Sequence, residues 1–233
     1  YSNSPAAVTL LPGINAVGRS SVGDVNGDGT LDIVSVTGQG FDARVVVADG
    51  SSPSALSPVI LANFRVPLPA NFTGGLFVAT GDFNADGKAD VAVTPDLTGT
   101  PRVFVYNGIT LVNGTASPAL LANFLGIASL NGQADTAFQG GARVAVGDVN
   151  GDSVADLLVT AGNGGGPRVT VWNGKGIGAA NGGQPTINPI ANLFVFEASQ
   201  RDGAYVASGD VNVDGNDDLV FGGGPNGGPR VRI

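Results

Sequence analysis

The chain of 233 residues contains no cysteine, no histidine and no methionine. Without cysteine it can form neither disulfides nor a thiolate site, and without histidine it lacks the commonest general base and transition-metal ligand. Charged residues make up only 13% of the chain and aromatic residues 6%. No apolar run reaches the roughly 18 residues that a membrane-spanning helix needs. We therefore expect no membrane insertion, and a fold held by something other than disulfides, for which bound metal is one option.

The net charge of −8 also lacks the basic surface that nucleic-acid binding requires, so nucleic acid is excluded as a partner. What the chain does contain is 42% hydrophobic residues, 38 glycines and 14 prolines. This composition supports a sizeable core built from many short strands and turns rather than long helices. It predicts an all-β fold.

One nine-residue pattern recurs four times, each copy preceded by glycine, at steps of 58, 66 and 62 residues. An apolar strand follows each copy, and an Arg-Val pair lies 20 residues after the first aspartate of each. Repetition at such a period is typical of propellers and other repeat folds. The copies are DVNGDGTLD (24–32), DFNADGKAD (82–90), DVNGDSVAD (148–156) and DVNVDGNDD (210–218).

Each repeat is expected to form four antiparallel strands. One strand precedes the aspartate loop, one follows it, one begins at the Arg-Val pair, and one follows a Ser-Pro or Asn-Pro pair after an Asp-Gly or Asn-Gly hairpin signal. Small residues lie three positions before each loop and favour an innermost strand near a crowded axis: Ser21, Ala79, Ala145 and Ala207. The glycine- and asparagine-rich stretch 175–187 is expected to be a surface loop. We predict a single domain, a β-propeller of four four-stranded antiparallel blades.

The strand count also predicts how the ring closes. After Arg230 the chain ends at Ile233, so the fourth repeat lacks its last strand, while Ser4-Pro5 begins a matching segment at the other end. We expect residues 5–11 to pair with the strand at 230–233 and to remove the exposed sheet edge. The approximate blades are then 12–64, 65–124, 125–196, and 197–233 together with 1–11.

The aspartate loops carry the candidate metal ligands. Oxygen atoms at alternate positions of a tight loop suit Ca²⁺, which takes six to eight oxygens. Positions 1, 3, 5 and 9 offer side-chain oxygens, and position 7, whose residue type varies, offers its backbone carbonyl. The predicted ligands of four Ca²⁺ ions are Asp24, Asn26, Asp28, Thr30 and Asp32; Asp82, Asn84, Asp86, Lys88 and Asp90; Asp148, Asn150, Asp152, Val154 and Asp156; and Asp210, Asn212, Asp214, Asn216 and Asp218.

Two other interpretations of these loops were weighed. An EF-hand would need glutamate at position 12 and flanking helices, but here the last acid is at position 9 and strands flank the loop. Ordinary Asp-Asn-Gly turns would explain one copy but not four at fixed positions. Twelve of the 19 acidic residues occupy positions 1, 5 and 9, where they would repel one another without a cation. Glycine at position 6 permits the sharp turn, and Ser153 replaces it in the third loop.

The repeated DxNxDGxxD loop, with GGGPRV (164–169) and GGPRV (227–231), resembles the FG-GAP/VCBS repeat of integrin α-subunit propellers and secreted bacterial proteins. The resemblance implies that each loop joins the first two strands of a blade and binds Ca²⁺. The chain departs from that family in having no evident Phe-Gly motif and four repeats rather than seven blades. No integrin partner or function is carried over.

Other residues allow alternatives. The equivalent arginines could form an anion-binding ring, but ties between neighbouring blades are favoured: Arg44, Arg102, Arg168 and Arg230. Trp172 with Tyr106 could form a sugar platform, but core packing is favoured. The remaining acids share no repeat position and have no histidine to support them, so no catalytic pair is predicted from Asp42, Asp49, Asp96, Asp135, Glu197, Asp202 and Asp217.

These observations favour a non-catalytic, calcium-stabilised module for adhesion, surface structure or scaffolding rather than an enzyme. A carbohydrate-binding propeller is the alternative, followed by a calcium-dependent propeller hydrolase or lyase. The expected partner is a protein or glycan at the cell surface. Because the cytosol is poor in calcium, the expected location is secreted or on the cell surface, within a larger extracellular protein as one possibility.

Overall fold

The computed structural model describes residues 18–52, 58–112, 114–127 and 137–233, and within them it is built almost entirely of short antiparallel strands. The first sheet contains β1 Arg19–Gly23, β2 Asp32–Val36, β3 Arg44–Ala48 and β4 Ile60–Arg65. The second contains β5 Leu76–Gly81, β6 Asp90–Pro95, β7 Arg102–Tyr106 and β8 Leu120–Leu125. The third contains β9 Ala142–Gly147, β10 Asp156–Ala161, β11 Arg168–Trp172 and β12 Ala191–Phe194. The last contains β13 Ala204–Gly209, β14 Asp218–Gly223 and β15 Val231–Arg232.

Each repeat forms one antiparallel sheet whose strands follow chain order. Three sheets have four strands and the fourth has three within the described residues. This confirms the all-β class and the division into one sheet per repeat. The strand expected to close the ring, residues 5–11, lies outside the described residues, so closure stays a prediction.

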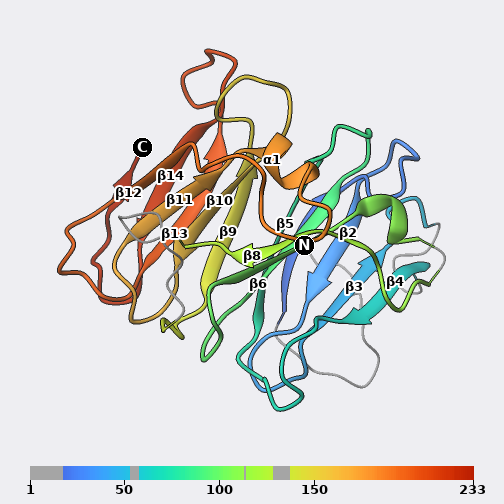
Figure 1. The fold of residues 1–233 in the computed structure, drawn as a ribbon, viewed down its shortest axis with the longest axis horizontal. Coiled ribbons are helices and arrows are strands. Elements are labelled where there is room, and N and C mark those ends of the chain that lie inside the picture. Colours follow the sequence, from blue (N-terminus) through green and yellow to red (C-terminus); the bar gives the residue numbers. More distant parts are fainter. Residues whose placement is uncertain (1–17, 53–57, 113, 128–136) are drawn as a thin grey trace, which may run out of the picture.

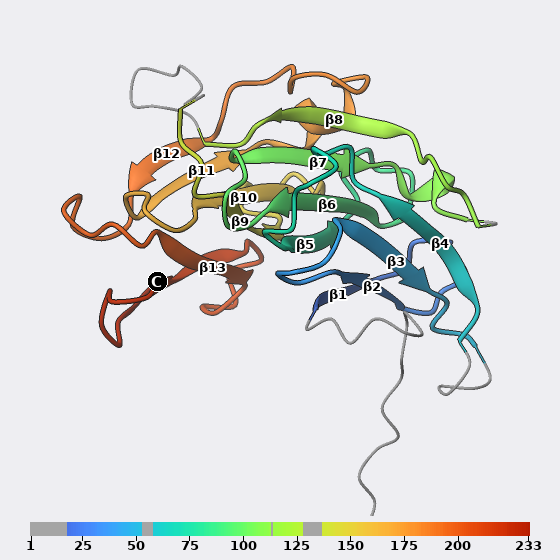
Figure 2. The ribbon, with the colours of Figure 1, turned by 90° about the horizontal axis from the view of Figure 1, so that it is seen from below.

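The four sheets are arranged as a fan (Figure 2). Successive first strands lie against one another, β1 on β5, β5 on β9 and β9 on β13, while β4, β8 and β12 lie on the outer side. The small residues expected at an inner strand therefore lie where the sheets crowd together. Ala79 of β5, for example, is 7% exposed.

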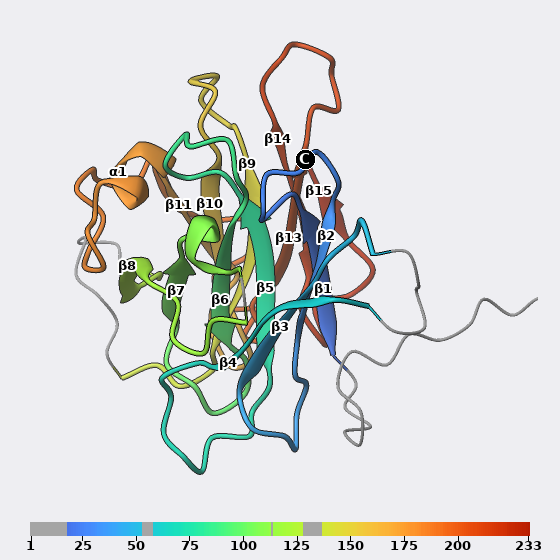
Figure 3. The same ribbon diagram turned by 90° about the vertical axis from the view of Figure 1, so that its right-hand side faces the viewer.

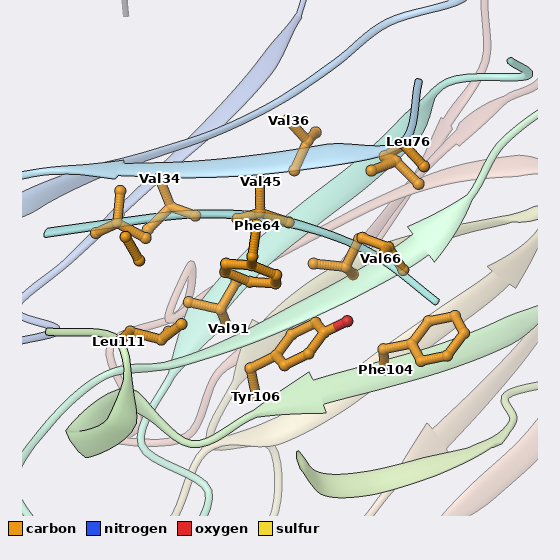
Figure 4. Packing of buried hydrophobic residues seen from close by; sticks show 14 of the residues in the cluster. Val34, Val36, Val45, Phe64, Val66, Leu76, Val91, Phe104, Tyr106 and Leu111 are labelled. Atoms are coloured by element: carbon orange, nitrogen blue, oxygen red, sulfur yellow. The ribbon is translucent and has the colours of Figure 1, made fainter. Parts of the chain in front are cut away.

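The core is a set of apolar layers between neighbouring sheets. Figure 4 shows the layer between the first two sheets, where Phe64 of β4 meets Tyr106 of β7 edge to face, with ring centroids 4.8 Å apart. Between the second and third sheets Phe124 and Trp172 repeat this arrangement at 4.9 Å. Such pairs add about 0.5–1.5 kcal/mol beyond the area that they bury. The core role favoured for Tyr106 and Trp172 is confirmed.

Two details differ from the sequence-based expectation. Residues 175–187 are not entirely loop, because Gly174–Gly178 form the short helix α1, which Asn173 caps by accepting a hydrogen bond from the Gly176 amide. A 3₁₀ turn, Gly108–Thr110, begins at the equivalent place in the second repeat, capped in the same way by Asn107. The Asn-Gly pairs thus start helical turns rather than two-residue hairpins.

The four repeat arginines were expected to tie neighbouring sheets, and the bonds seen among the described residues lie mostly within one sheet. Three of them donate to an asparagine on the fourth strand of their own sheet: Arg44 to Asn63 at 2.8 Å, Arg102 to Asn123, and Arg168 to Asn192 at 2.7 Å. Arg230 instead pairs with Glu197 at 2.7 Å. Because the third and fourth strands are neighbours in the sheet, the three arginine–asparagine bonds stabilise single sheets, whereas Arg230 of the fourth repeat reaches Glu197, which follows the last strand of the third sheet.

Candidate metal centres

All four aspartate loops lie at the same edge of the fan, where they connect the first and second strands of each sheet (Figures 1 and 3). Backbone bonds join consecutive loops. The amide at position 8 of one loop donates to the position 1 carbonyl of the loop before it: Ala89 to Asp24, Ala155 to Asp82, and Asp217 to Asp148. The loops are therefore held in fixed places along a shared rim.

Within the first loop, side-chain oxygens turn inward onto the loop's own backbone. Asp24 at position 1 accepts hydrogen bonds from the amides of Gly27, Asp28 and Gly29 at 2.7–3.1 Å. Asn26 at position 3 accepts from the Asp28 amide, and Asp28 at position 5 accepts from the Thr30 amide, both at 2.8 Å. The sequence thus places three side chains with oxygen atoms that could ligate a metal around one tight turn.

The other three loops repeat this pattern. In each, position 1 accepts from the amides of positions 5 and 6, position 3 from position 5, and position 5 from position 7. The donating amides are those of Asp86, Gly87 and Lys88 in the second loop, Asp152, Ser153 and Val154 in the third, and Asp214, Gly215 and Asn216 in the fourth. The accepting side chains are, in the same order of loops, Asp82, Asn84 and Asp86; Asp148, Asn150 and Asp152; and Asp210, Asn212 and Asp214.

Two positions of every loop have a left-handed backbone. Position 6 was expected to need one, and φ there is +86°, +82°, +64° and +93° at Gly29, Gly87, Ser153 and Gly215. Position 4 also needs one, which the sequence analysis missed. There φ is +79°, +57°, +70° and +62° at Gly27, Ala85, Gly151 and Val213. The turn is therefore built over a strained residue wherever a non-glycine occupies these positions.

Position 9 has a different environment from positions 1, 3 and 5. Asp32, Asp90 and Asp156 are fully buried at the start of the second strand. The Asp90 carboxylate accepts from the Phe83 amide at 3.0 Å and from the Gly108 amide at 2.8 Å. Its position-9 counterparts make the same two bonds, from Val25 and Gly50 and from Val149 and Gly174. This carboxylate therefore anchors the loop to the turn that follows the third strand.

The glycine of that turn has a steric role as well. A Cβ built on Gly50, Gly108 or Gly174 would lie 1.9, 2.3 or 2.0 Å from the carbonyl oxygen at position 8 of the loop. Only glycine allows the loop and the turn to approach this closely. The Asp-Gly and Asn-Gly pairs that the sequence marked as hairpins are thus part of the loop's support.

The carboxylates of a loop differ in pKa as their environments differ. Burial raises the pKa of Asp32 and Asp156, and raises that of Asp90 to about 7. At position 5, the Thr30 amide and the Asn26 side chain lower the pKa of Asp28, and the Asn216 amide does the same for Asp214. Buried negative charge at position 9 next to ionised groups at position 5 is costly, and a bound cation would relieve that cost.

The donor set fits Ca²⁺ chemically, because every candidate ligand is an oxygen and no sulfur or imidazole is present. Among the described residues, no three Asp or Glu side chains are close enough to hold a metal by themselves. The carboxylates at positions 1, 5 and 9 of a loop are thus not gathered around one point, and a Ca²⁺ bound there would also need the asparagine and carbonyl oxygens that the sequence predicts as ligands. Positions 1, 3 and 5 accept hydrogen bonds from amides of the loop itself, whereas position 9 is bound at the start of the second strand.

The third loop also has a lysine beside one of its carboxylates. Lys175, from α1, forms an ion pair with Asp152 at 3.1 Å. Although burial works the other way, the Lys175 ammonium and the Val154 amide lower the pKa of Asp152. A cation at this loop would have to compete with a lysine.

Among the described residues, the acids outside the loops do not gather into a second site. Asp96 pairs with Arg19 at 2.7 Å, Asp42 with Arg44 and Arg65 at 3.2 and 3.4 Å, and Glu197 with Arg230. Asp135 lies outside the described residues. The sequence analysis missed Arg19 and the buried Arg143, which bridge the inner strands.

Comparison with solved structures shows similarity of fold. A rhamnogalacturonan lyase from Bacillus licheniformis is 15% identical, with a TM-score of 0.55, and the match covers 88% of this chain and 39% of the lyase. The rhamnogalacturonan lyase YesW is 16% identical, with a TM-score of 0.53, over 89% of this chain and 40% of the lyase. A lectin from Agrocybe aegerita that recognises terminal N-acetylglucosamine is 17% identical, with a TM-score of 0.47, over 94% of this chain and 53% of the lectin. The chain thus spans about two fifths to one half of these proteins.

A search of curated proteins finds no significant match. Models of repeat families do match. The FG-GAP-like repeat covers residues 24–93 and 82–159, and the FG-GAP repeat covers residues 140–184. Together they span three of the four aspartate loops and more than half of the chain. The resemblance found in the loops is confirmed, and this chain belongs to the FG-GAP repeat family.

Proposed function

We propose that this repeat module binds one Ca²⁺ in each aspartate loop and serves as a non-catalytic scaffold or adhesion module outside the cell. The observation that carries the proposal is the fourfold repetition of one oxygen-lined turn, with positions 1, 3 and 5 folded onto the same backbone amides in every copy. A hard cation that takes oxygen ligands is the partner that such a turn suits.

Calcium would act on stability through the shared rim. Consecutive loops are bonded through position 8, and three of the four loops are also bonded through position 9 to the turn that follows the third strand of their sheet. A cation that neutralises the carboxylates of a loop therefore stabilises the junction between two sheets as well as the turn itself. Binding to the folded state at 100 times Kd contributes about 2.7 kcal/mol per site.

The proposed location of the protein outside the cell follows from the affinity of calcium sites of this kind. Calcium sites of extracellular modules commonly bind at about 10⁻⁴–10⁻³ M, a concentration met outside the cell but not in the cytosol. No helix in the described part of the chain is long and apolar enough to cross a membrane. A secreted or surface-exposed setting supports full occupancy of such sites.

A non-catalytic role is supported by the acids outside the loops. Among the described residues, Asp96, Asp42 and Glu197 are engaged in three separate sets of ion pairs with arginine. The lyases and the lectin share the fold alone at 13–17% identity, and function depends on sites rather than folds.

A glycan array separates the scaffold from the lectin alternative. The chain should bind no glycan on the array, with calcium or with chelator, and should release no product from rhamnogalacturonan. Calcium-dependent binding to one glycan class would overturn the scaffold proposal in favour of a lectin, and product release would overturn it in favour of a lyase.

The predicted pairing of residues 5–11 with β15 is a separate question from calcium binding. Strand β15 pairs with β14 on one side, and Val231 and Ile233 are exposed. Residues 5–11, which lie outside the described residues, are predicted to pair with this edge, because an unpaired strand edge recruits other chains.

A further inference from the structure

One position of the inner strands alternates between arginine and an aromatic residue from sheet to sheet. Five residues before each loop aspartate lie Arg19, Phe77, Arg143 and Tyr205. The Arg19 guanidinium lies 3.6 Å from the centre of the Phe77 ring. The Arg143 guanidinium lies between two rings, 4.1 Å from Tyr205 and 6.0 Å from Phe77. Arginine over an aromatic face is attractive, so these residues form a stack along the fan's axis.

The arginines also bond to the next sheet in the same way. Arg19 donates to the Leu76 carbonyl at 2.7 Å, and Arg143 donates to the Ala204 carbonyl at 3.1 Å. Leu76 and Ala204 are equivalent, each lying directly before the aromatic residue. The junction between the first and second sheets and the junction between the third and fourth sheets are therefore built by the same contacts, each with an arginine on the earlier sheet and an aromatic residue on the later one.

Each sheet presents two different inner edges, one to the sheet before it and one to the sheet after it. The residue three before the loop faces the following sheet, and the residue two before it faces the preceding sheet. Ser21 and Thr80 meet in this way, with their hydroxyl oxygens 2.8 Å apart. Ser208 likewise donates to the carbonyl of Val146. The junctions are therefore directional.

At the two ends of the fan these edges have no such neighbour among the described residues. On the first sheet, Val22 is 57% exposed and Leu31 is 61% exposed. On the fourth sheet, Ala207 is exposed and Tyr205 is 47% exposed.

The glycines before the loops mark the same difference. A Cβ on Gly23, Gly81 or Gly147 would lie 2.7, 2.4 or 2.4 Å from the next sheet, whereas at Gly209 it would meet nothing within 4 Å. The fourth sheet thus keeps the glycine of a close junction without a sheet against it.

We propose that the first sheet of a second copy of this chain occupies the exposed face of the fourth sheet. Tyr205 of one copy then lies against Arg19 of the other, and reproduces the order of Phe77 and Arg143 within the chain. The alternation favours this partner, because the stack begins with an arginine and ends with an aromatic ring. Two such junctions, related by symmetry, close two copies into one ring.

The occupant is a second copy rather than the chain's own first sheet, which stands at the far end of the fan (Figure 2). Continuity supports the choice, because the proposed junction has the same order of aromatic residue and arginine as the junction between the second and third sheets, where Phe77 precedes Arg143. The closed ring of one copy that the sequence predicted is the competing outcome.

Cysteine cross-linking tests the junction cleanly, because the chain has no cysteine of its own. Val22→Cys and Ala207→Cys are prepared as separate full-length variants and then mixed under oxidising conditions. The mixture should yield a disulfide-linked pair of chains, and neither variant alone should do so.

Two controls fix the geometry. Ser21→Cys with Thr80→Cys in one chain repeats the residue pair of an existing junction and should form an internal disulfide. Mixing Ala207→Cys with Ile190→Cys, whose exposed side chain lies away from the junction, should yield no cross-link.

A chain carrying both Val22→Cys and Ala207→Cys distinguishes the competing closure. Disulfides between chains support the proposal, whereas an internal disulfide in a single chain overturns it. Sedimentation should give twice the chain mass of 23.1 kDa, and a single-chain mass at every concentration overturns the proposal. Tyr205→Ala should weaken the association roughly threefold or more, while Tyr205→Phe, which keeps the ring, should not.

Discussion

Position 6 of the third loop is occupied by a residue that the backbone conformation disfavours. Ser153 has φ of +64°, where the other loops have glycine. Position 4 of the fourth loop has a stronger conflict, because Val213 is β-branched at φ +62°. Left-handed conformations cost a non-glycine residue roughly 1–2 kcal/mol.

Replacing either residue by glycine should therefore stabilise the protein. Ser153→Gly and Val213→Gly should each raise the free energy of unfolding by about 1 kcal/mol, measured by urea denaturation. Val211→Gly is the matched control, since Val211 is an exposed valine of the same loop without positive φ, and this change should bring no gain. Equal effects at 211 and 213 would contradict the role assigned to backbone strain.

The buried Asp90 carboxyl predicts a pH dependence in chelator. Burial raises its pKa to about 7 in the folded chain, against about 3.9 when unfolded. Between these values the folded state holds a proton that the unfolded state has lost, so this group stabilises the fold at low pH and the contribution is lost as pH rises through 7. Melting temperatures in chelator should therefore fall between pH 5 and pH 8.

Asp90→Asn is the variant that isolates this effect. It should be less stable than the parent, because it replaces one of the acceptors for the Phe83 and Gly108 amides with a donor, but its melting temperature should change less with pH. An unchanged slope would show that Asp90 does not titrate in this range.

At the scale of the element, the first and third loops differ in how well they support a cation. Asp24 accepts three amides and Asp148 accepts two, and the third loop also contains strained Ser153 and the Lys175 ion pair. In calcium, Asp24→Ala should therefore lower the free energy of unfolding more than Asp148→Ala does. Urea denaturation with and without chelator measures both losses, and a larger loss for Asp148→Ala would contradict the ranking.

The sequence predicted the strands and loops well because their signals are local. Alternating apolar residues mark β7 and β11, and repeated aspartates mark the loops. The sequence did not predict the roles that depend on neighbouring sheets. Nothing local indicates that Gly108 supports a loop 18 residues earlier, or that Arg143 bridges two rings. Position 4 could have been found, since glycine occupies it in two of the four copies.

At the scale of the whole molecule, the sequence predicts the number of sheets. Four loops imply four sheets, because each loop needs a strand on either side. Whether the sheets close into a ring depends on the angle between each sheet and the next. That angle is set by the volume of the side chains in the three apolar layers between the sheets. No single residue encodes that angle.

The closing strand has a direct test by deletion. Removing residues 1–11 should leave the edge of β15 unpaired, and such edges recruit other chains, so the shortened protein should aggregate as judged by light scattering. Removing only residues 1–3 is the control and should leave the protein unchanged. A shortened protein that scatters light no more than the control would refute a strand at 5–11.

The central claim, that each aspartate loop binds Ca²⁺, is tested most directly by calorimetric titration of the metal-free protein with calcium, followed by thermal unfolding of the same samples. The account predicts four calcium ions per chain, with the third loop the weakest, and a melting temperature that rises substantially on loading because each site adds free energy to the folded state. Absence of binding heat, together with identical melting curves in calcium and in chelator, would contradict it.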